Sequence, residues 1–256
     1  MRILLFLVLS LCPKIYNVMS RNKMKQFAEN SVNPIFFQPY YQELLDGFFL
    51  KGKWNKEFFK NDHPIILELG CGKGEYTVGL AEKYPDKNFI GIDLKGARMW
   101  RGATDAQEKG LNNVAFIRNK VDKLLYFFDH QEVAEIWLTF SDPQPKRERR
   151  RLTSPRFLRL YQEALLKDGI VHVKTDSREL FDYTLDVINY FSLPLKYHTF
   201  DLYNSGYKGD APQIQTYYEK IYLAEGKAIN YAQFSLNEKL RNSDIYKLPK
   251  NDADGE

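Results

Sequence analysis

Cysteine is scarce in this chain, and histidine is little more frequent. The 256 residues include only two cysteines, Cys12 and Cys71, and four histidines. Cys71 lies inside a glycine-rich stretch, so no structural disulfide is expected, and a reducing compartment fits the composition. Two cysteines and four scattered histidines supply no cluster with the spacing of a metal site, so we expect no metal.

Long apolar runs are also absent. Residues 3–12 are apolar but end before Pro13, short of the ~20 residues that span a bilayer, and no small-x-small cleavage site follows. Met19 and the polar residues after it look like an ordinary start. We interpret residues 1–18 as an extension from an upstream start, with a signal-like segment as the alternative. We expect a basic arm and helix over 19–63, an α/β domain over 64–228 and a polar tail over 229–256.

What the chain does have is a strand, a glycine-rich turn and a helix in direct succession. The apolar run 65–69 ends in Gly70, Gly72 and Gly74, and residues 75–84 follow a helical pattern. A second apolar run ends in Asp93, where a nucleotide-binding fold hydrogen-bonds ribose hydroxyls. The spacing G-x-G-x-G differs from the G-x-G-x-x-G of dinucleotide binders. Lys73 is not followed by the Ser or Thr of a P-loop.

Strands and helices alternate after this turn, which predicts parallel pairing with helices on both faces of the sheet. Near the C-terminus, residues 195–202 and 216–223 are β-like without a helix between them, so we expect an antiparallel hairpin at one sheet edge. The other elements that we expect are a helix over 40–50, a helix over 95–109, a strand over 114–118, a helix over 122–130, a strand over 133–140, a helix over 154–166, a strand over 170–174 and a helix over 176–190.

Positive charge is concentrated behind the fourth strand, although the net charge is only +4. Asp142 lies beside Pro143 in a turn stiffened by two prolines, and five basic residues follow within six positions, 146–151. Ligands in open α/β sheets bind outside the carboxyl ends of the strands. We therefore interpret this segment as a phosphate-binding loop, with a solvated charge run as the alternative.

The sequence Glu-Leu-Gly-Cys-Gly-Lys-Gly at 68–74 resembles the first motif of Rossmann-like S-adenosylmethionine (SAM) methyltransferases. The resemblance implies the class I fold, with a mostly parallel seven-stranded sheet and an antiparallel edge hairpin, and SAM as cofactor. The residues that it assigns to the cofactor are Glu68, Gly70, Gly72, Gly74, Asp93, Asn119, Lys120 and Asp142.

Ser141 to Lys146 and the arginines after it resemble the Pro-Asp-Pro-Trp-x-Lys-Lys signature of bacterial tRNA (guanine-N7)-methyltransferases. Lys174-Thr175-Asp176 resembles the Thr-Asp of that family after its fifth strand, and residues 216–219 resemble its Thr-x-x-Glu. The resemblance implies methylation of a guanine in the tRNA variable loop, expected at guanosine-46. The expected substrate residues are Lys146, Arg147, Arg150, Asp176, Thr216, Tyr217, Tyr218 and Glu219.

Three positions depart from the family pattern. Ser141 replaces a proline, Gln144 replaces an aromatic residue, and Asn119-Lys120 stands where the family commonly has an acid near the adenine. An asparagine can still hydrogen-bond an adenine edge, whereas Lys120 has no evident role there. Asn119 and Lys120 therefore stay the residues expected beside the adenine.

Guanine N7 carries a free lone pair, so the reaction needs alignment more than a general base. On the resemblance, Asp142 would stabilise the positive charge that moves into the guanine, and would be the catalytic residue. Asp176 and Glu219 would accept hydrogen bonds from the guanine N1–H and amino group, and Lys146 would bind a phosphate or O6. The alternatives are a helix N-cap for Asp176 and a solvent-facing strand position for Glu219.

Other functions remain open at this point. They are a SAM methyltransferase for another RNA base or a protein, a nicotinamide oxidoreductase and a non-catalytic RNA-binding module. The oxidoreductase is disfavoured by the glycine spacing. We expect a cytoplasmic monomer or homodimer that binds tRNA, with neither a membrane nor an obligatory protein partner.

Overall fold

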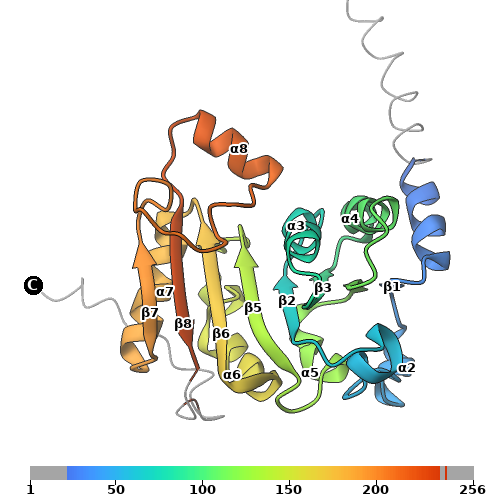
Figure 1. Ribbon diagram of the computed structural model, residues 1–256. Coiled ribbons are helices and arrows are strands. Elements are labelled where there is room, and N and C mark those ends of the chain that lie inside the picture. Colours follow the sequence, from blue (N-terminus) through green and yellow to red (C-terminus); the bar gives the residue numbers. More distant parts are fainter. Residues whose placement is uncertain (1–21, 237–239, 241–256) are drawn as a thin grey trace, which may run out of the picture.

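The protein is built around a mixed eight-stranded sheet, seen in a computed structural model that describes residues 22–236 and Leu240 (Figure 1). The expectations for residues 1–18 and for the end of the polar tail lie outside these residues. The strand order is β1-β4-β3-β2-β5-β6-β8-β7. The strands are β1 (Phe36–Phe37), β2 (Ile65–Leu69), β3 (Asn88–Asp93), β4 (Val114–Arg118), β5 (Val133–Thr139), β6 (Leu165–Thr175), β7 (Leu195–Thr199) and β8 (Asn230–Ser235).

Parallel pairing runs from β1 to β6, and β8 alone is antiparallel to both of its neighbours, β6 and β7. This confirms the expected class, with one strand more than the seven that the family resemblance implies. The extra strand is β1, two residues that pair with the outer side of β4. No helix in the part of the chain that the structure describes could cross a bilayer.

Helices cover both faces of the sheet and enclose two hydrophobic cores. Adjacent residues of β2 point to opposite cores, Ile65 and Leu67 to one and Ile66 to the other. The core on the Ile66 side includes α3 (Glu75–Lys83) and α4 (Gly96–Glu108). The opposite core takes in α5 (Leu124–Phe127), α6 (Pro155–Ala164) and α7 (Arg178–Tyr190).

The segment expected to be an N-terminal arm is largely part of the fold. Residues 22–32 form a helix. The helix expected over 40–50 is shorter than predicted, since only α2 (Tyr41–Leu45) is helical there. Gly47, with φ 98°, follows this short helix. A π-helix, η1 (Trp54–Phe59), was not predicted. Trp54 is fully buried and its indole N–H donates to the Phe127 carbonyl at 2.9 Å, so this segment completes one core.

The expected strand over 216–223 is wrong, because these residues form the helix α8 (Tyr217–Ala224). Thr216 and Glu219 form a reciprocal capping box, which satisfies free backbone N–H groups at the helix start. The strand that pairs with β7 is β8, in the region expected to be a polar tail. The antiparallel edge pair therefore exists, but the boundary at 228 cuts through the sheet.

The remaining elements follow the expectations with shifted ends. Ser154 and Pro155 begin α6 as expected, but β6 starts at Leu165 and runs through Gly169. The helix expected over 122–130 is reduced to α5 after a short 3₁₀ turn, η2 (Val121–Lys123). The N-cap of α7 is Ser177, whose hydroxyl accepts from the Leu180 N–H.

Candidate active site

Five parallel strands, β2 to β6, end at the same edge of the sheet (Figure 1). Most of the expected site residues lie at these ends or directly after them, and the others belong to α8 and its N-cap. The glycine-rich turn follows β2, Asp93 ends β3, and Asn119 comes directly after β4. Asp142 and Asp176 follow β5 and β6. The carboxyl edge of such a sheet is the usual place for a ligand.

The glycine-rich turn is fixed by backbone hydrogen bonds to β3. Gly70 N–H and Cys71 N–H both donate to the Ile92 carbonyl, at 2.8 and 3.1 Å. Gly70, Gly72 and Gly74 all have positive φ, between 57° and 79°, which L side chains rarely adopt. A Cβ on Gly72 would meet no atom within 4 Å, so the outer surface of the turn is open to a ligand.

Asp93 links the end of β3 to this turn. Its carboxylate accepts from the Gly72 N–H at 3.0 Å and from the Lys95 N–H at 2.8 Å. Asn119 lies beside it, since its N–H donates to the Asp93 carbonyl at 3.0 Å. The Asn119 side-chain oxygen accepts from the Lys120 N–H, and the Lys120 side chain is exposed. The structure thus brings three of the expected cofactor residues together.

Glu68 lies beneath the turn rather than on its surface. Its carboxylate is buried and accepts from the Thr77 N–H at 2.8 Å and from the hydroxyls of Thr77 and Thr139. Burial raises the pKa of Glu68 to about 7, against the three hydrogen bonds that favour the charged form. The side chain therefore ties β2 to the first turn of α3 and to the end of β5.

The loop after β5 holds Asp142 at the surface. Its carboxylate accepts from the Gln144 N–H at 3.1 Å, which closes a tight turn. Phe140 and Gln144 have φ of 50° and 46°, so the turn depends on two left-handed residues as well as on prolines. Phe140 N–H donates to the Lys174 carbonyl, which fixes the loop to β6.

Arg151, the last residue of the basic run, is an internal anchor and not a surface cation. Its side chain is 1% exposed, and its Nε donates to the Pro143 carbonyl at 2.8 Å. The guanidinium pairs with Glu179 and lies 4.5 Å from the Tyr183 ring centroid. The expected substrate residues Lys146, Arg147 and Arg150 are exposed beside it, so the phosphate-loop interpretation applies to the first part of the run.

Helix α8 begins next to the glycine-rich turn. Tyr217 N–H donates to the Glu75 carboxylate at 3.1 Å, and the Lys73 ammonium lies 4.4 Å from the Tyr217 ring centroid. Tyr217 and Tyr218 are about half exposed, at 52% and 48%. Thr216, the N-cap, is half-buried. Two half-exposed aromatic side chains therefore lie next to the glycine-rich turn.

Glu219 does not reach the surface, although it was expected to contact guanine. It is fully buried, and its Oε1 lies 2.6 Å from the ammonium of Lys174, which is also fully buried. It also accepts from the Tyr203 hydroxyl at 2.7 Å. Neither the guanine contact nor the solvent-facing alternative fits this placement. Asp176, in contrast, is half-buried at the site edge and leaves the N-cap of α7 to Ser177.

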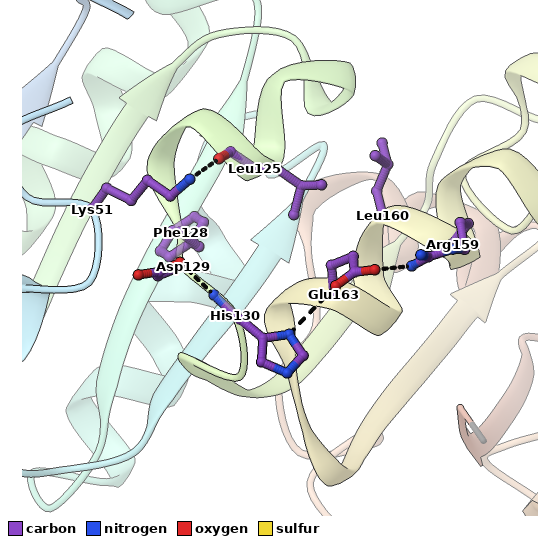
Figure 2. Close-up of a pocket in the computed structure, with 8 residues that line it drawn as sticks. All are labelled: Lys51, Leu125, Phe128, Asp129, His130, Arg159, Leu160 and Glu163. Atoms are coloured by element: carbon purple, nitrogen blue, oxygen red, sulfur yellow. Dashed lines mark hydrogen bonds and ion pairs between the residues drawn. The ribbon is translucent and has the colours of Figure 1, made fainter. Parts of the chain in front are cut away.

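A cavity of about 400 Å³ lies at the other end of the sheet, away from the glycine-rich turn (Figure 2). Its wall includes Asp129 and His130, which precede β5, and residues of α6. The Glu163 carboxylate is contacted by two side chains of this wall: His130 Nδ1 lies 3.4 Å from it, and Arg159 is bound to it. None of the expected site residues lines this cavity.

Sequence reasoning missed three side chains that build the site from inside: Arg151, Lys174 and Tyr203. Arg151 was grouped with its exposed neighbours, because a run of like charges carries no sign of which member is buried. Lys174 was read only as part of a motif, although a lysine that ends an apolar strand signals a buried partner. The Thr-x-x-Glu spacing of a capping box was itself visible at 216–219.

Known proteins resemble this chain in sequence and in fold. The family described as "Putative methyltransferase" matches residues 62–232. A tRNA (guanine-N(7)-)-methyltransferase of Bacteroides fragilis is 50% identical over 230 residues, which cover 89% of this chain and 91% of that protein. One of Christiangramia forsetii is 52% identical over 221 residues, 85% of this chain and 99% of the relative.

Among solved structures, the 16S rRNA methyltransferase KamB superposes with a TM-score of 0.56 at 13% identity, covering 71% of this chain and 92% of that one. At this identity the likeness concerns the fold alone. The two relatives at about 50% identity are each aligned over at least 85% of this chain. The chain therefore belongs to the tRNA (guanine-N7)-methyltransferase family.

Proposed function

We propose that this protein transfers a methyl group from SAM to N7 of a guanine in tRNA, at guanosine-46 of the variable loop. The observation that carries the proposal is the shared edge of the sheet: Asp93 ends β3, and the glycine-rich turn, Asp142 and Asp176 follow the ends of β2, β5 and β6. Relatives named tRNA (guanine-N(7)-)-methyltransferase at about 50% identity support the same substrate.

The turn and the acids around it fit a nucleoside with a cationic sulfur. Gly72 presents backbone with open space, and a carboxylate at the end of β3 suits ribose hydroxyls. We assign Gly70, Gly72, Gly74 and Asp93 to direct cofactor contact, with Asn119 and Lys120 beside the adenine. Glu68 supports the turn from below through Thr77 and Thr139.

SAM would supply an electrophilic methyl group: guanine N7 would give the electron pair for the new carbon–nitrogen bond as the methyl–sulfur bond breaks, and the electron pair of the broken bond would return to sulfur, leaving a neutral thioether. No proton leaves N7, so the chain's task is to align the base and to stabilise charge. Asp142 is exposed and fixed by its turn, and its carboxylate stabilises the positive charge that develops in the guanine ring. Asp176 accepts from the guanine N1–H and amino group.

The tRNA body is held by charge and by aromatic surface. Lys146, Arg147 and Arg150 are exposed on the Asp142 loop, where they neutralise phosphates. Tyr217 and Tyr218 lie next to the glycine-rich turn, where half-exposed rings stack on unpaired bases of a loop. A tRNA substrate and SAM as donor fit a reaction in the cytoplasm, and the proposal includes a protein that acts as a monomer or homodimer.

The direct test is to incubate unmodified tRNA with the protein and SAM, digest the RNA and identify the methylated nucleosides by mass spectrometry. We expect 7-methylguanosine, and cleavage of the RNA chain at that nucleoside should map it to position 46. Another methylated base, or methylation only of protein in a mixed extract, would reject the proposed substrate. Methylation of guanine elsewhere in tRNA would reject only the position.

A further inference from the structure

A lysine and a glutamate form an ion pair in the protein interior, directly behind the site. Lys174 and Glu219 are each 0% exposed and their charged atoms are 2.6 Å apart. Two buried charges are costly to desolvate, and a buried pair seldom adds net stability over apolar residues of similar size. We therefore expect this pair to have a role other than stabilising the fold.

Lys174 binds three groups in the segment that connects β7 to β8. Its ammonium donates to the carbonyls of Ala211 and Ile214, at 2.5 and 3.0 Å, in addition to its bond with Glu219. An ammonium has three protons, so these three acceptors use all of them. One side chain at the end of β6 thus holds the loop 211–214 and helix α8 together.

Glu219 completes the network from the side of the helix. Its N–H donates to the Thr216 hydroxyl at 3.2 Å, and its carboxylate accepts from the Thr216 N–H at 3.3 Å and from the Tyr203 hydroxyl at 2.7 Å. The carboxylate therefore fixes the start of α8, where Tyr217 and Tyr218 lie next to the glycine-rich turn. Tyr76 of α3 adds a bond to the Ala211 carbonyl.

We propose that Lys174 and Glu219 are positioning residues for tRNA: they hold the start of α8, with Tyr217 and Tyr218, against the glycine-rich turn, and neither touches the substrate. This inference rests on the proposed function for its substrate. It assigns Glu219, the glutamate of the Thr-x-x-Glu motif, an ion pair with the buried Lys174 and not a contact with the guanine base. Lys174 is fully buried, so it acts only through the segment that it holds.

A double-mutant cycle tests the coupling, with Lys174→Met, Glu219→Gln and the double variant. Each single variant leaves one buried charge unpaired, whereas the double variant leaves none. We expect each single change to raise the KM for tRNA by about tenfold or more, with a smaller loss in the double variant. Since the cofactor surface is untouched, the Kd for SAM should change less than twofold.

Additive effects in the cycle would overturn the proposal, as expected if Glu219 bound guanine directly. A loss of SAM binding equal to the loss of tRNA binding would also overturn it, because the pair would then support the whole fold. Hydrogen exchange supplies a readout that needs no activity. In folded single variants, amides of residues 203–224 should exchange faster while those of β2 and β3 keep their rates.

If the Lys174→Met and Glu219→Gln proteins do not fold, a milder substitution still tests the proposal. Tyr203→Phe removes only the hydroxyl that donates to Glu219, and the α8 amides should then exchange about fivefold faster. The matched control is Tyr207→Phe in the same segment, whose hydroxyl contacts Tyr231 outside the network. Equal exchange in the two variants would reject the positioning role, even if the protein proved to methylate another substrate.

Discussion

At the scale of single residues, the site separates into acids that face the substrate edge and acids that build it from within. Asp142 and Asp176 are accessible, whereas Glu68 and Glu219 are buried and hydrogen-bonded to the protein. All four were expected from sequence to contact a ligand. Residue type and motif position are visible in a sequence, but the depth of a side chain depends on what packs over it.

Asp142 is expected to act on the chemical step. Asp142→Asn removes the charge and keeps the shape, and single-turnover methyl transfer to tRNA should fall by about 10²- to 10³-fold. Binding of SAM should weaken far less. Asp168→Asn, an exposed acid near the start of β6, is the matched control and should transfer methyl groups at the parent rate. Equal rates for the Asp142 variant and the control would remove Asp142 from catalysis.

Glu68 should make stability depend on pH. Burial raises its pKa to about 7, so between pH 4.5 and 7 the folded state holds a proton that the unfolded state has lost. The free energy of unfolding should therefore fall as the pH rises through this window, by up to about 3 kcal/mol. Glu68→Gln mimics the protonated form, and urea titrations should show a weaker pH dependence and a more stable protein at pH 8. An unchanged profile would show that Glu68 is ionised when folded.

At the scale of elements, the alternation of strands and helices was predictable because parallel strands carry apolar runs bounded by turn residues. Asp93 and the glycine-rich turn lie as expected, since their geometry is set by local sequence. The strand expected over 216–223 was wrong: its aromatic and β-branched residues favour a strand locally, whereas Thr216 and Glu219 form a capping box that begins a helix. The burial of Arg151 and the two-residue strand β1 depend on distant partners, Glu179 and β4, that no local pattern reveals.

The glycine-rich turn offers two glycines with different constraints. A Cβ on Gly74 would lie 2.6 Å from the ring of Phe116, which is fully buried, whereas one on Gly72 would meet nothing within 4 Å. We expect Gly74→Ala to lower the free energy of unfolding by more than about 2 kcal/mol, from clash and positive φ together. Gly72→Ala should cost about 1 kcal/mol, from φ alone, and act mainly on SAM affinity. Calorimetry and urea titration separate the two effects.

The exposed arginines of the Asp142 loop should contribute phosphate contacts. Replacing Arg147 and Arg150 by alanine should weaken tRNA binding and reduce the slope of log K against log salt by roughly 1.5. A control pair, Lys167→Ala with Lys196→Ala, removes the same charge at the start of β6 and β7, the far end of the sheet. If both pairs change the slope equally, the loop has no special share in binding.

At the scale of the whole molecule, β8 integrates the sheet. It lies between β6 and β7, antiparallel to both, and Tyr231, Ala232 and Phe234 are fully buried. The last described strand in the sequence thus occupies an interior position, and the partner of β7 comes from beyond α8. The sequence correctly predicted an antiparallel pair at the sheet edge. Its second strand was expected at 216–223, which forms α8, whereas the observed strand is β8.

Proline substitution should distinguish the interior strand from the edge. Ala232→Pro removes a ladder hydrogen bond in β8 and should prevent folding or cost more than about 3 kcal/mol. Leu195→Pro lies at the first residue of the edge strand β7, where proline is tolerated, and should cost less than about 1 kcal/mol. Thermal unfolding of both variants gives the comparison. Similar decreases in the free energy of unfolding would mean that β7 contributes as much to stability as β8.

The position of β8 in the sheet also has a consequence for the synthesis of the protein on the ribosome. Residues 165–199 are synthesised well before residues 230–235, yet among the described residues β7 joins the sheet only through β8. Until that late segment emerges, the nascent chain presents the bare flank of β6, a template on which a stray strand can pair. Translation that stalls before residue 230 should therefore release an aggregation-prone polypeptide and not a smaller working enzyme.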